Sequence, residues 1–140
     1  MNNITFRPVK RKDLDEVFPL LQQLTIINYS SRDKDECWNK FITNNSSNSI
    51  VGVYNDKIIA YGSIVIEHKI RGAIAGHIED IVVDKSIRGK SIGIKLIEEL
   101  VKIGSSNNCY RITLTCKQNL INFYKRNNFE VDNIAMKLRL

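Results

Sequence analysis

Residues 81–97 form the most informative segment of the chain and read Ile81-Val-Val-Asp-Lys-Ser-Ile-Arg-Gly-Lys-Ser-Ile-Gly-Ile-Lys-Leu-Ile97. It begins with a hydrophobic β-branched segment, continues through a basic turn that contains glycine, and ends in an amphipathic helical pattern. A turn that enters a helix directs several unpaired backbone N–H groups the same way, and the positive end of the helix dipole adds to them. The stretch therefore predicts a strand, an anion-binding turn and a helix.

The residues of this turn suit a phosphate group. Gly89 and Gly93 let the backbone approach a ligand closely, and Arg88 and Lys90 supply full positive charge. The turn has neither the G-x-x-x-x-G-K-[ST] pattern of a P-loop nor the G-x-G-x-x-G fingerprint of dinucleotide-binding proteins, so ATP and NAD are disfavoured as ligands. Glycine and lysine can also occur in a strand-to-helix turn that binds nothing.

Strand and helix patterns surround this stretch on both sides. Upstream, the sequence predicts a strand at 5–9, helices at 13–24 and 33–43, strands at 49–54 and 57–66 in a hairpin, and a long strand at 73–83. Downstream, it predicts a helix that ends at Gly104, a strand at 111–116, a helix over 120–126 capped by Asn119, and a last strand at 136–140. The order βααβββαβαβ predicts an α/β (α+β) fold with a mixed, mostly antiparallel central sheet flanked by about four helices.

Length, charge and cysteine use set limits on the function. The 140 residues suit one domain that spans residues 1–140. The formal net charge is +6, but the basic residues that cluster lie around the turn, which favours a local anion site over a nucleic-acid surface. The three cysteines form no C-x-x-C pair, no apolar run is long enough to cross a bilayer, and the first residues lack a signal-peptide pattern. We therefore expect a cytoplasmic protein with reduced thiols.

The turn Arg88-Gly-Lys-Ser-Ile-Gly93 resembles the [QR]-x-x-G-x-[GA] turn with which acetyltransferases of the GNAT family hold the pyrophosphate of acetyl-CoA. Ser91 stands where the first glycine of the motif usually lies, although its N–H group remains available. The resemblance implies a GNAT fold, acetyl-CoA as the co-substrate and an N-acetyltransferase activity.

A more specific resemblance covers nearly the whole second half of the chain. The stretches 76–84, 96–104, 109–112 and 122–129 are similar to those of the glucosamine-6-phosphate N-acetyltransferase family, and weaker similarity extends to Leu24-Thr25 and to 66–70. This resemblance implies transfer of an acetyl group from acetyl-CoA to the amine of glucosamine 6-phosphate by direct attack in a ternary complex. It also implies a homodimer that shares its acceptor sites.

The resemblance assigns roles to individual residues near the cofactor. The pantetheine arm would pair with the backbone of Ile81, Val82 and Val83, and the pyrophosphate would be held by Arg88, Gly89, Lys90, Ser91, Ile92, Gly93 and Ile94. Tyr124 would face the thioester sulfur, where a phenol can donate a proton to the departing thiolate. The alternative for Tyr124 is an ordinary core aromatic.

The acceptor pocket would be lined by Glu79 and Asp80, either of which could hold the amine or a water that accepts its proton. Adjacent residues on a regular strand face opposite ways, so without a bulge only one of the two can point into the site. The positions that match contacts to the sugar phosphate are Thr25, Lys69, Ile70, Arg71, Tyr110, Arg111 and Arg139.

Thr115 departs from the pattern, because the family carries at this position an aspartate that contacts the amino sugar. A hydroxyl can form hydrogen bonds but cannot act as a carboxylate base. Either Glu79 or Asp80 then handles the proton, or the acceptor differs from glucosamine 6-phosphate, or activity is low.

Other functions remain open or are disfavoured. His68 and His77 have no metal-ligand spacing, so we predict no metal site, and Cys116 has no histidine placed near it by a local motif that would make it an acyl-accepting nucleophile. One alternative is an acetyltransferase for another amine, such as a different amino sugar, a polyamine or a protein terminus. A second is an acyl-CoA-binding or nucleic-acid-binding module without turnover, which Ser91, Thr115 and the basic charge would support.

Overall fold

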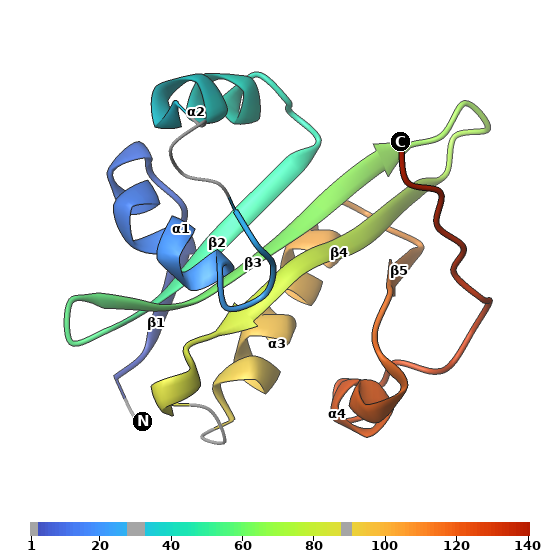
Figure 1. Cartoon of the computed structure of the whole chain (residues 1–140). Coiled ribbons are helices and arrows are strands. Elements are labelled where there is room, and N and C mark those ends of the chain that lie inside the picture. Colours follow the sequence, from blue (N-terminus) through green and yellow to red (C-terminus); the bar gives the residue numbers. More distant parts are fainter. Residues whose placement is uncertain (1–2, 28–32, 88–90) are drawn as a thin grey trace.

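Five strands form one mixed sheet in the computed structural model, which describes residues 3–27, 33–87 and 91–140 (Figure 1). They lie across the sheet in the order β1 (Thr5–Pro8), β2 (Ser47–Tyr54), β3 (Lys57–His68), β4 (Ile74–Val83) and β5 (Arg111–Leu114). Neighbours from β1 to β4 are antiparallel, whereas β5 joins β4 in parallel. The predicted mixed, mostly antiparallel sheet is confirmed.

The α-helices of the described residues are α1 (Leu14–Leu21), α2 (Lys34–Ile42), α3 (Ile92–Ser106) and α4 (Ile121–Lys125). Alternate residues of β3 show which helices lie on which face of the sheet. A Cβ atom on Gly62 would meet Leu96 and Leu100 of α3, whereas the neighbouring Tyr61 lines a cavity with residues of α1 and α2. α1 and α2 therefore cover one face and α3 covers the other (Figure 1).

Helix α3 forms because its apolar residues recur every three or four positions and face the sheet. Its buried side chains Ile92, Leu96, Ile97 and Leu100 pack in one core cluster with isoleucines of β3 and β4. Burial of each such side chain stabilises the fold by roughly 1.5–3 kcal/mol. The core thus fixes the first turn of α3 relative to the end of β4.

Gly104 lies inside α3 and does not end it, so this part of the prediction is wrong. The helix continues to Ser106. A Cβ atom on Gly104 would lie 2.6 Å from Ile112 Cδ1, so glycine is required here for the close approach of α3 to β5. Packing explains this residue better than helix termination does.

A partly buried ion pair attaches the start of α1 to β1. The Asp13 carboxylate accepts hydrogen bonds from Arg7 Nη1 and Nη2 at 2.7 and 2.9 Å, and a third from the backbone N–H of Lys10 at 2.7 Å. The hydrogen bonds from Arg7 are the largest cause of the lowered pKa of Asp13, and burial opposes them. The pair therefore holds α1 in place on the face that it shares with α2.

The C-terminal segment corrects two further predictions. Asn119 does not cap α4, because it lies in a 3-10 turn (Gln118–Leu120) and Leu120 occupies the N-cap position. The strand predicted at 136–140 does not form, and the described residues contain no strand after β5. The alternating apolar side chains of this tail are exposed: Val131, Ile134, Met136, Leu138 and Leu140. Alternation favours a strand only where a partner strand exists, and the described residues pair no strand with this segment.

Candidate active site

Pairing between β4 and β5 ends at Ile78 and Leu114. β4 continues to Val83, and on its other side it stays paired with β3. In the described part of the chain, the β5-side edge of residues 79–82 therefore has no strand beside it. Such an edge can form backbone hydrogen bonds with an extended ligand. Two of the residues predicted to pair with the pantetheine arm, Ile81 and Val82, lie on this edge, and Val83 follows as the last residue of β4.

A bulge in β4 places both predicted carboxylates on one face. Ser63 pairs with Glu79, whereas Tyr61 pairs with Val82, so Gly62 lies opposite two residues. The first of these, Asp80, has a left-handed φ of 55°. Directly opposite residues share a face, so Glu79 lies on the α1 and α2 face with Ser63.

Asp80 lies on this same face. The negative charge of Asp80 contributes to the raised pKa of Tyr61, whose side chain faces α1 and α2. The next residue, Ile81, faces the other way, because its Cδ1 would lie only 2.8 Å from a Cβ atom on Gly62, on the α3 side. Glu79 and Asp80 are both exposed, and the described residues give neither a hydrogen bond nor an ion pair. The sequence could not decide whether both point into the site, and the bulge brings them together.

The turn before α3 shows why a glycine is usual at the position of Ser91. Ser91 is the N-cap residue of α3 and has a left-handed φ of 62°, with no side-chain capping hydrogen bond. Glycine adopts this conformation without cost, whereas other residues lose roughly 1–2 kcal/mol. The serine keeps the geometry of the motif and leaves the first N–H groups of α3 available to an anion. Arg88, Gly89 and Lys90 lie outside the described residues.

The remaining residues of the turn serve packing as well. The Ile92 side chain is in the core, so only its backbone can reach a ligand. A Cβ atom on Gly93 would lie 2.8 Å from Phe123 Cζ, and the Ile94 carbonyl accepts a hydrogen bond from Asn127 Nδ2 at 3.3 Å. α4 and the segment that follows it therefore pack directly against the first turn of α3.

Tyr124 of α4 lies buried beside this turn. Its ring makes edge contacts with Phe123 and Phe129, at centroid distances of 4.9 and 6.1 Å. Burial raises the pKa of Tyr124, and the nearby Cys116 thiol adds to this effect. A raised pKa keeps the phenol protonated, which suits a proton donor, while the packing also fits a core aromatic. The structure shows that Tyr124 packs in the core, and its role as a proton donor stays a prediction.

Three of the predicted sugar-phosphate contacts form one cluster. Arg71 Nη2 donates a hydrogen bond to Tyr110 Oη at 3.0 Å, and the Arg111 guanidinium lies 5.2 Å from the centre of the same ring. Arg111 pairs with Ala75 of β4, which lies four residues before Glu79 on the same face. The cationic cluster and the carboxylates thus lie along one face of β4, roughly 13 Å apart at the backbone.

A polar bridge that the sequence reasoning missed lies between them. His77 Nε2 contacts Glu67 Oε1 at 3.0 Å, and His77 Nδ1 contacts Thr113 Oγ1 at 2.7 Å. Lys69, a predicted phosphate contact, is held by the same Glu67 oxygen at 3.1 Å. The hydrogen bonds from His77 and then Lys69 lower the pKa of Glu67. The two-residue spacing of His77 and Glu79 on a strand is the signal that places His77 on the acceptor face.

The other predicted acceptor contacts are not brought into this cluster. Thr25 lies exposed after α1, with its backbone N–H bonded to the Leu21 carbonyl. Ile70 is fully exposed in the turn between β3 and β4, and Arg139 is exposed in the tail. Thr115 is exposed just beyond β5, where the parallel register would bring it opposite Glu79.

Residues 14–129 match the model of the acetyltransferase (GNAT) family. The chain belongs to the GNAT acetyltransferase family. It is therefore an acetyl-CoA-dependent N-acetyltransferase. The GNAT domain is also 37% identical over 145 residues to glucosamine 6-phosphate N-acetyltransferase 1 of Dictyostelium discoideum, an alignment that covers 99% of this chain and 92% of that protein. Its identity to the glucosamine 6-phosphate N-acetyltransferase of Candida albicans is 30%, over 96% of this chain and 95% of that protein.

Solved structures agree with this assignment. The GNAT fold matches glucosamine-6-phosphate N-acetyltransferase from Arabidopsis thaliana with a TM-score of 0.89 and 31% identity, over 98% of each chain. A Trypanosoma brucei acetyltransferase matches with a TM-score of 0.90 and 28% identity, over 99% of this chain and 100% of that one. The predicted GNAT fold and its resemblance to the glucosamine-6-phosphate N-acetyltransferases are confirmed.

The site residues fit the acetyl-CoA that this family uses. The strand edge at 79–82 offers backbone groups to an amide-bearing arm, and the first N–H groups of α3, which follow the left-handed Ser91, have no partner within the helix. Within residues 3–27, 33–87 and 91–140, no group of three or more His, Cys, Asp or Glu side chains could hold a metal ion. No helix in these ranges is long and apolar enough to cross a membrane.

Proposed function

We propose that this GNAT enzyme acetylates the amine of glucosamine 6-phosphate, giving N-acetylglucosamine 6-phosphate and CoA. The observation that carries the proposal is the charge arrangement along one face of β4. Glu79 and Asp80 lie at the bulge, and Arg71 and Arg111 lie toward the start of the strand. An ammonium suits the first pair and a phosphate dianion suits the second. The relatives named for this activity supply independent support.

The chemistry follows from the groups at the bulge. The cofactor supplies an activated acetyl group when it is bound. The Glu79 and Asp80 carboxylates hold the substrate amine, and one of them accepts its proton, directly or through a water, as the nitrogen attacks the acetyl carbon. The Tyr124 hydroxyl holds the proton that passes to the sulfur as the carbon–sulfur bond breaks. Both transfers take place in a ternary complex, without an acyl-enzyme.

Thr115 favours one competing acceptor class. A hydroxyl cannot offset an ammonium charge. The second candidate is therefore an amine that does not need a carboxylate at the position of Thr115, such as a different amino sugar. In either case Glu79 and Asp80 are the only carboxylates at the bulge among the described residues, and one of them takes the proton.

The test of the acceptor is thiol release from acetyl-CoA with a panel of amines. Glucosamine 6-phosphate should give the highest kcat/KM, and glucosamine without its phosphate should lose most of it through KM. Release with other amines alone would refute the acceptor assignment but not the acetyltransferase. Tight CoA binding with no amine turned over would favour the binding-module reading.

We further propose a homodimer in the cytoplasm, whose product enters UDP-N-acetylglucosamine biosynthesis. The apolar side chains of residues 131–140 that stay exposed support the dimer, because exposed apolar side chains that gather in one segment suit the surface of a second copy. Light scattering should give a dimer mass for the full chain and a monomer mass after deletion of 131–140. A full chain that stays monomeric at micromolar concentration would contradict the dimer.

A further inference from the structure

A side chain from the turn that follows α1 contacts the backbone just before the predicted pyrophosphate turn. Gln23 Oε1 accepts a hydrogen bond from the Lys85 N–H group at 2.9 Å, although the two residues lie 62 positions apart in the sequence. Lys85 begins a short 3-10 turn (Lys85–Ile87), and Arg88, the residue after it, is the first of those predicted to hold the pyrophosphate. Gln23 has no part in the mechanism proposed for the reaction.

The direction of this hydrogen bond follows from the two groups themselves. A backbone N–H group can only donate, so the side-chain atom that it meets is the carbonyl oxygen of the amide. Gln23 also adds to the lowering of the Asp84 pKa, after the larger effect of the hydrogen bond from the Ser86 N–H group. Gln23 therefore acts as an acceptor for the backbone at the start of the 3-10 turn.

The 3-10 turn is held together by its own residues. Asp84 Oδ1 accepts hydrogen bonds from the Ser86 N–H and Oγ groups at 3.0 and 3.1 Å, and the Asp84 carbonyl accepts one from the Ile87 N–H group at 3.1 Å. The Asp84 N–H group donates to the Ile59 carbonyl of β3 at 2.8 Å. These contacts give the turn its shape and attach it to the sheet, and the bond to Gln23 attaches it to the end of α1.

An open cleft of about 310 Å³ lies between α1 and the end of β4. Glu16, Leu20, Gln23, Lys57 and Asp84 are among the residues that line it. Side chains do not fill this space, so close packing does not hold the two sides of the cleft together there. The Gln23 hydrogen bond is a direct link across the same region.

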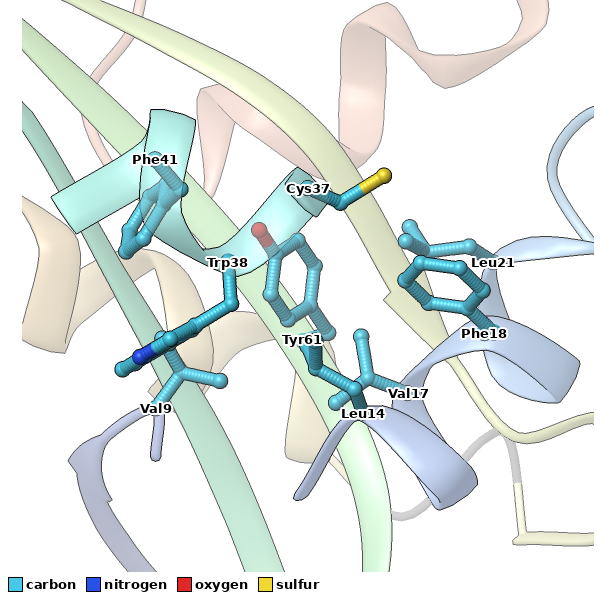
Figure 2. A pocket seen from close by; sticks show the side chains of 9 residues that line it. All are labelled: Val9, Leu14, Val17, Phe18, Leu21, Cys37, Trp38, Phe41 and Tyr61. Atoms are coloured by element: carbon cyan, nitrogen blue, oxygen red, sulfur yellow. The ribbon is translucent and has the colours of Figure 1, made fainter. Parts of the chain in front are cut away.

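α1 is a fixed base from which Gln23 reaches this turn. Figure 2 shows four apolar side chains of α1 around the cavity of about 130 Å³ that Tyr61 and α2 also line: Leu14, Val17, Phe18 and Leu21. Elsewhere on the helix, Glu16 Oε2 accepts a hydrogen bond from the Ile58 N–H group of β3 at 2.8 Å. The Gln23 N–H group donates to the Leu20 carbonyl at 3.1 Å, which ties Gln23 to the helix.

We propose that Gln23 is a positioning residue for acetyl-CoA: its amide oxygen fixes the 3-10 turn, and through it the backbone that binds the pyrophosphate. A binding segment that is held in place before its ligand arrives loses less conformational entropy on binding. Gln23 thus raises the affinity for the cofactor without touching it. The inference rests on the proposed enzyme holding its pyrophosphate at the turn before α3, and it is independent of which amine is acetylated.

The first test measures CoA binding by calorimetry. Gln23→Met keeps the length of the side chain and removes the acceptor, so Kd for CoA should rise about 3- to 10-fold, as expected for one lost hydrogen bond. Gln22→Met is the matched control, because Gln22 Nε2 donates to the Ile27 carbonyl at 2.9 Å and not to the 3-10 turn. Its Kd for CoA should change less than about twofold.

The second test separates positioning of the pyrophosphate turn from a general structural effect. S-acetylpantetheine carries the thioester and the arm of acetyl-CoA but has no pyrophosphate. In Gln23→Met, kcat/KM should fall about 3- to 10-fold with acetyl-CoA and less than about twofold with S-acetylpantetheine. The kcat at saturating acetyl-CoA should stay near the wild-type value.

The third test removes the donor. Lys85→Pro eliminates the N–H group at the first position of the 3-10 turn, where the fixed φ of proline is tolerated, and Lys85→Ala removes the charge alone. Kd for CoA should be higher in Lys85→Pro than in Lys85→Ala. Adding Gln23→Met to Lys85→Pro should raise it less than about twofold further, since the hydrogen bond is already gone.

An unchanged Kd for CoA in Gln23→Met would overturn the proposal. Equal losses of kcat/KM with acetyl-CoA and S-acetylpantetheine would also overturn it, because they indicate a structural role, and so would a full additional loss in the double variant. The calorimetry needs no acceptor. A wrong assignment of glucosamine 6-phosphate would therefore appear only in the panel of amines and would leave the result for Gln23 intact.

Discussion

Gly93 in the first turn of α3 lies against the ring of Phe123 in α4, so closely that a Cβ atom would come within 2.8 Å of Phe123 Cζ. Phe123 is the neighbour of Tyr124 and makes an edge contact with its ring. The turn that carries the N–H donors and the residue assigned the acid role therefore share one packing contact. A change in one must move the other.

Gly93→Ala should displace α4 and lower kcat/KM about 10- to 100-fold, because a shift of about 1 Å in a catalytic group costs this much. The extra methyl group should also destabilise the fold by about 1–3 kcal/mol. Steady-state kinetics and urea unfolding measure the two effects. Glu98→Ala, an exposed change in the same helix, should affect neither. Normal kinetics in Gly93→Ala would show that the contact relaxes without moving Tyr124.

Tyr124→Phe should lower kcat by about 10²-fold or more, since it removes the proton donor, while KM for acetyl-CoA stays near the wild-type value. The melting temperature should change little, because the ring keeps its contacts with Phe123 and Phe129. Retention of most of kcat would assign Tyr124 to the core alone.

Arg111→Ala should raise KM for glucosamine 6-phosphate about 10-fold or more and leave KM for unphosphorylated glucosamine nearly unchanged, because in the proposed site the lost cation pairs with the phosphate. Initial rates with the two acceptors at fixed acetyl-CoA measure the ratio. Lys125→Ala, an exposed cation on α4, is the control. Equal effects on both acceptors would place Arg111 outside the phosphate site.

Asp13→Asn should destabilise the fold by about 1.5–3 kcal/mol at pH 7, because it weakens the hydrogen bonds to Arg7. The pKa of Asp13 is lower in the folded protein, so its contribution is present above the ordinary aspartate pKa of about 3.9 and is lost as the pH falls through the folded value. Urea unfolding of both proteins should therefore give a difference that is constant near neutrality and shrinks below pH 4. A difference that grows on acidification would contradict this assignment.

Local patterns were enough to predict most of the fold. The strand, turn and helix at 81–97 follow from hydrophobic period and glycine placement, which depend on neighbours in the sequence. The bulge at Asp80 could not be predicted, because the register of β4 depends on β3, and the contact between Gln23 and Lys85 appears only after α1 is placed on the sheet. Gly104 was misread for the same reason, since the atom that excludes a Cβ there belongs to β5.

The candidate site also has one part that local sequence patterns predict and another part that depends on how the strands pair. Apart from Tyr124, the residues predicted to hold the cofactor are continuous in sequence, and those from Ile81 to Ile94 that the structure describes lie in the predicted strand, turn and helix. The proposed acceptor side combines residues of β3, β4 and β5, so the bridge from Glu67 through His77 to Thr113 gave no local signal. Arg139 lies in the exposed tail after β5, so its predicted contact with the sugar phosphate stays a prediction.

The strand edge at 79–82 has a practical consequence for handling the protein. An edge that keeps its backbone groups for a ligand is, without that ligand, a template on which another polypeptide can pair and from which aggregates can grow. Purification and storage with saturating CoA should therefore suppress precipitation more than the gain in thermal stability alone would explain.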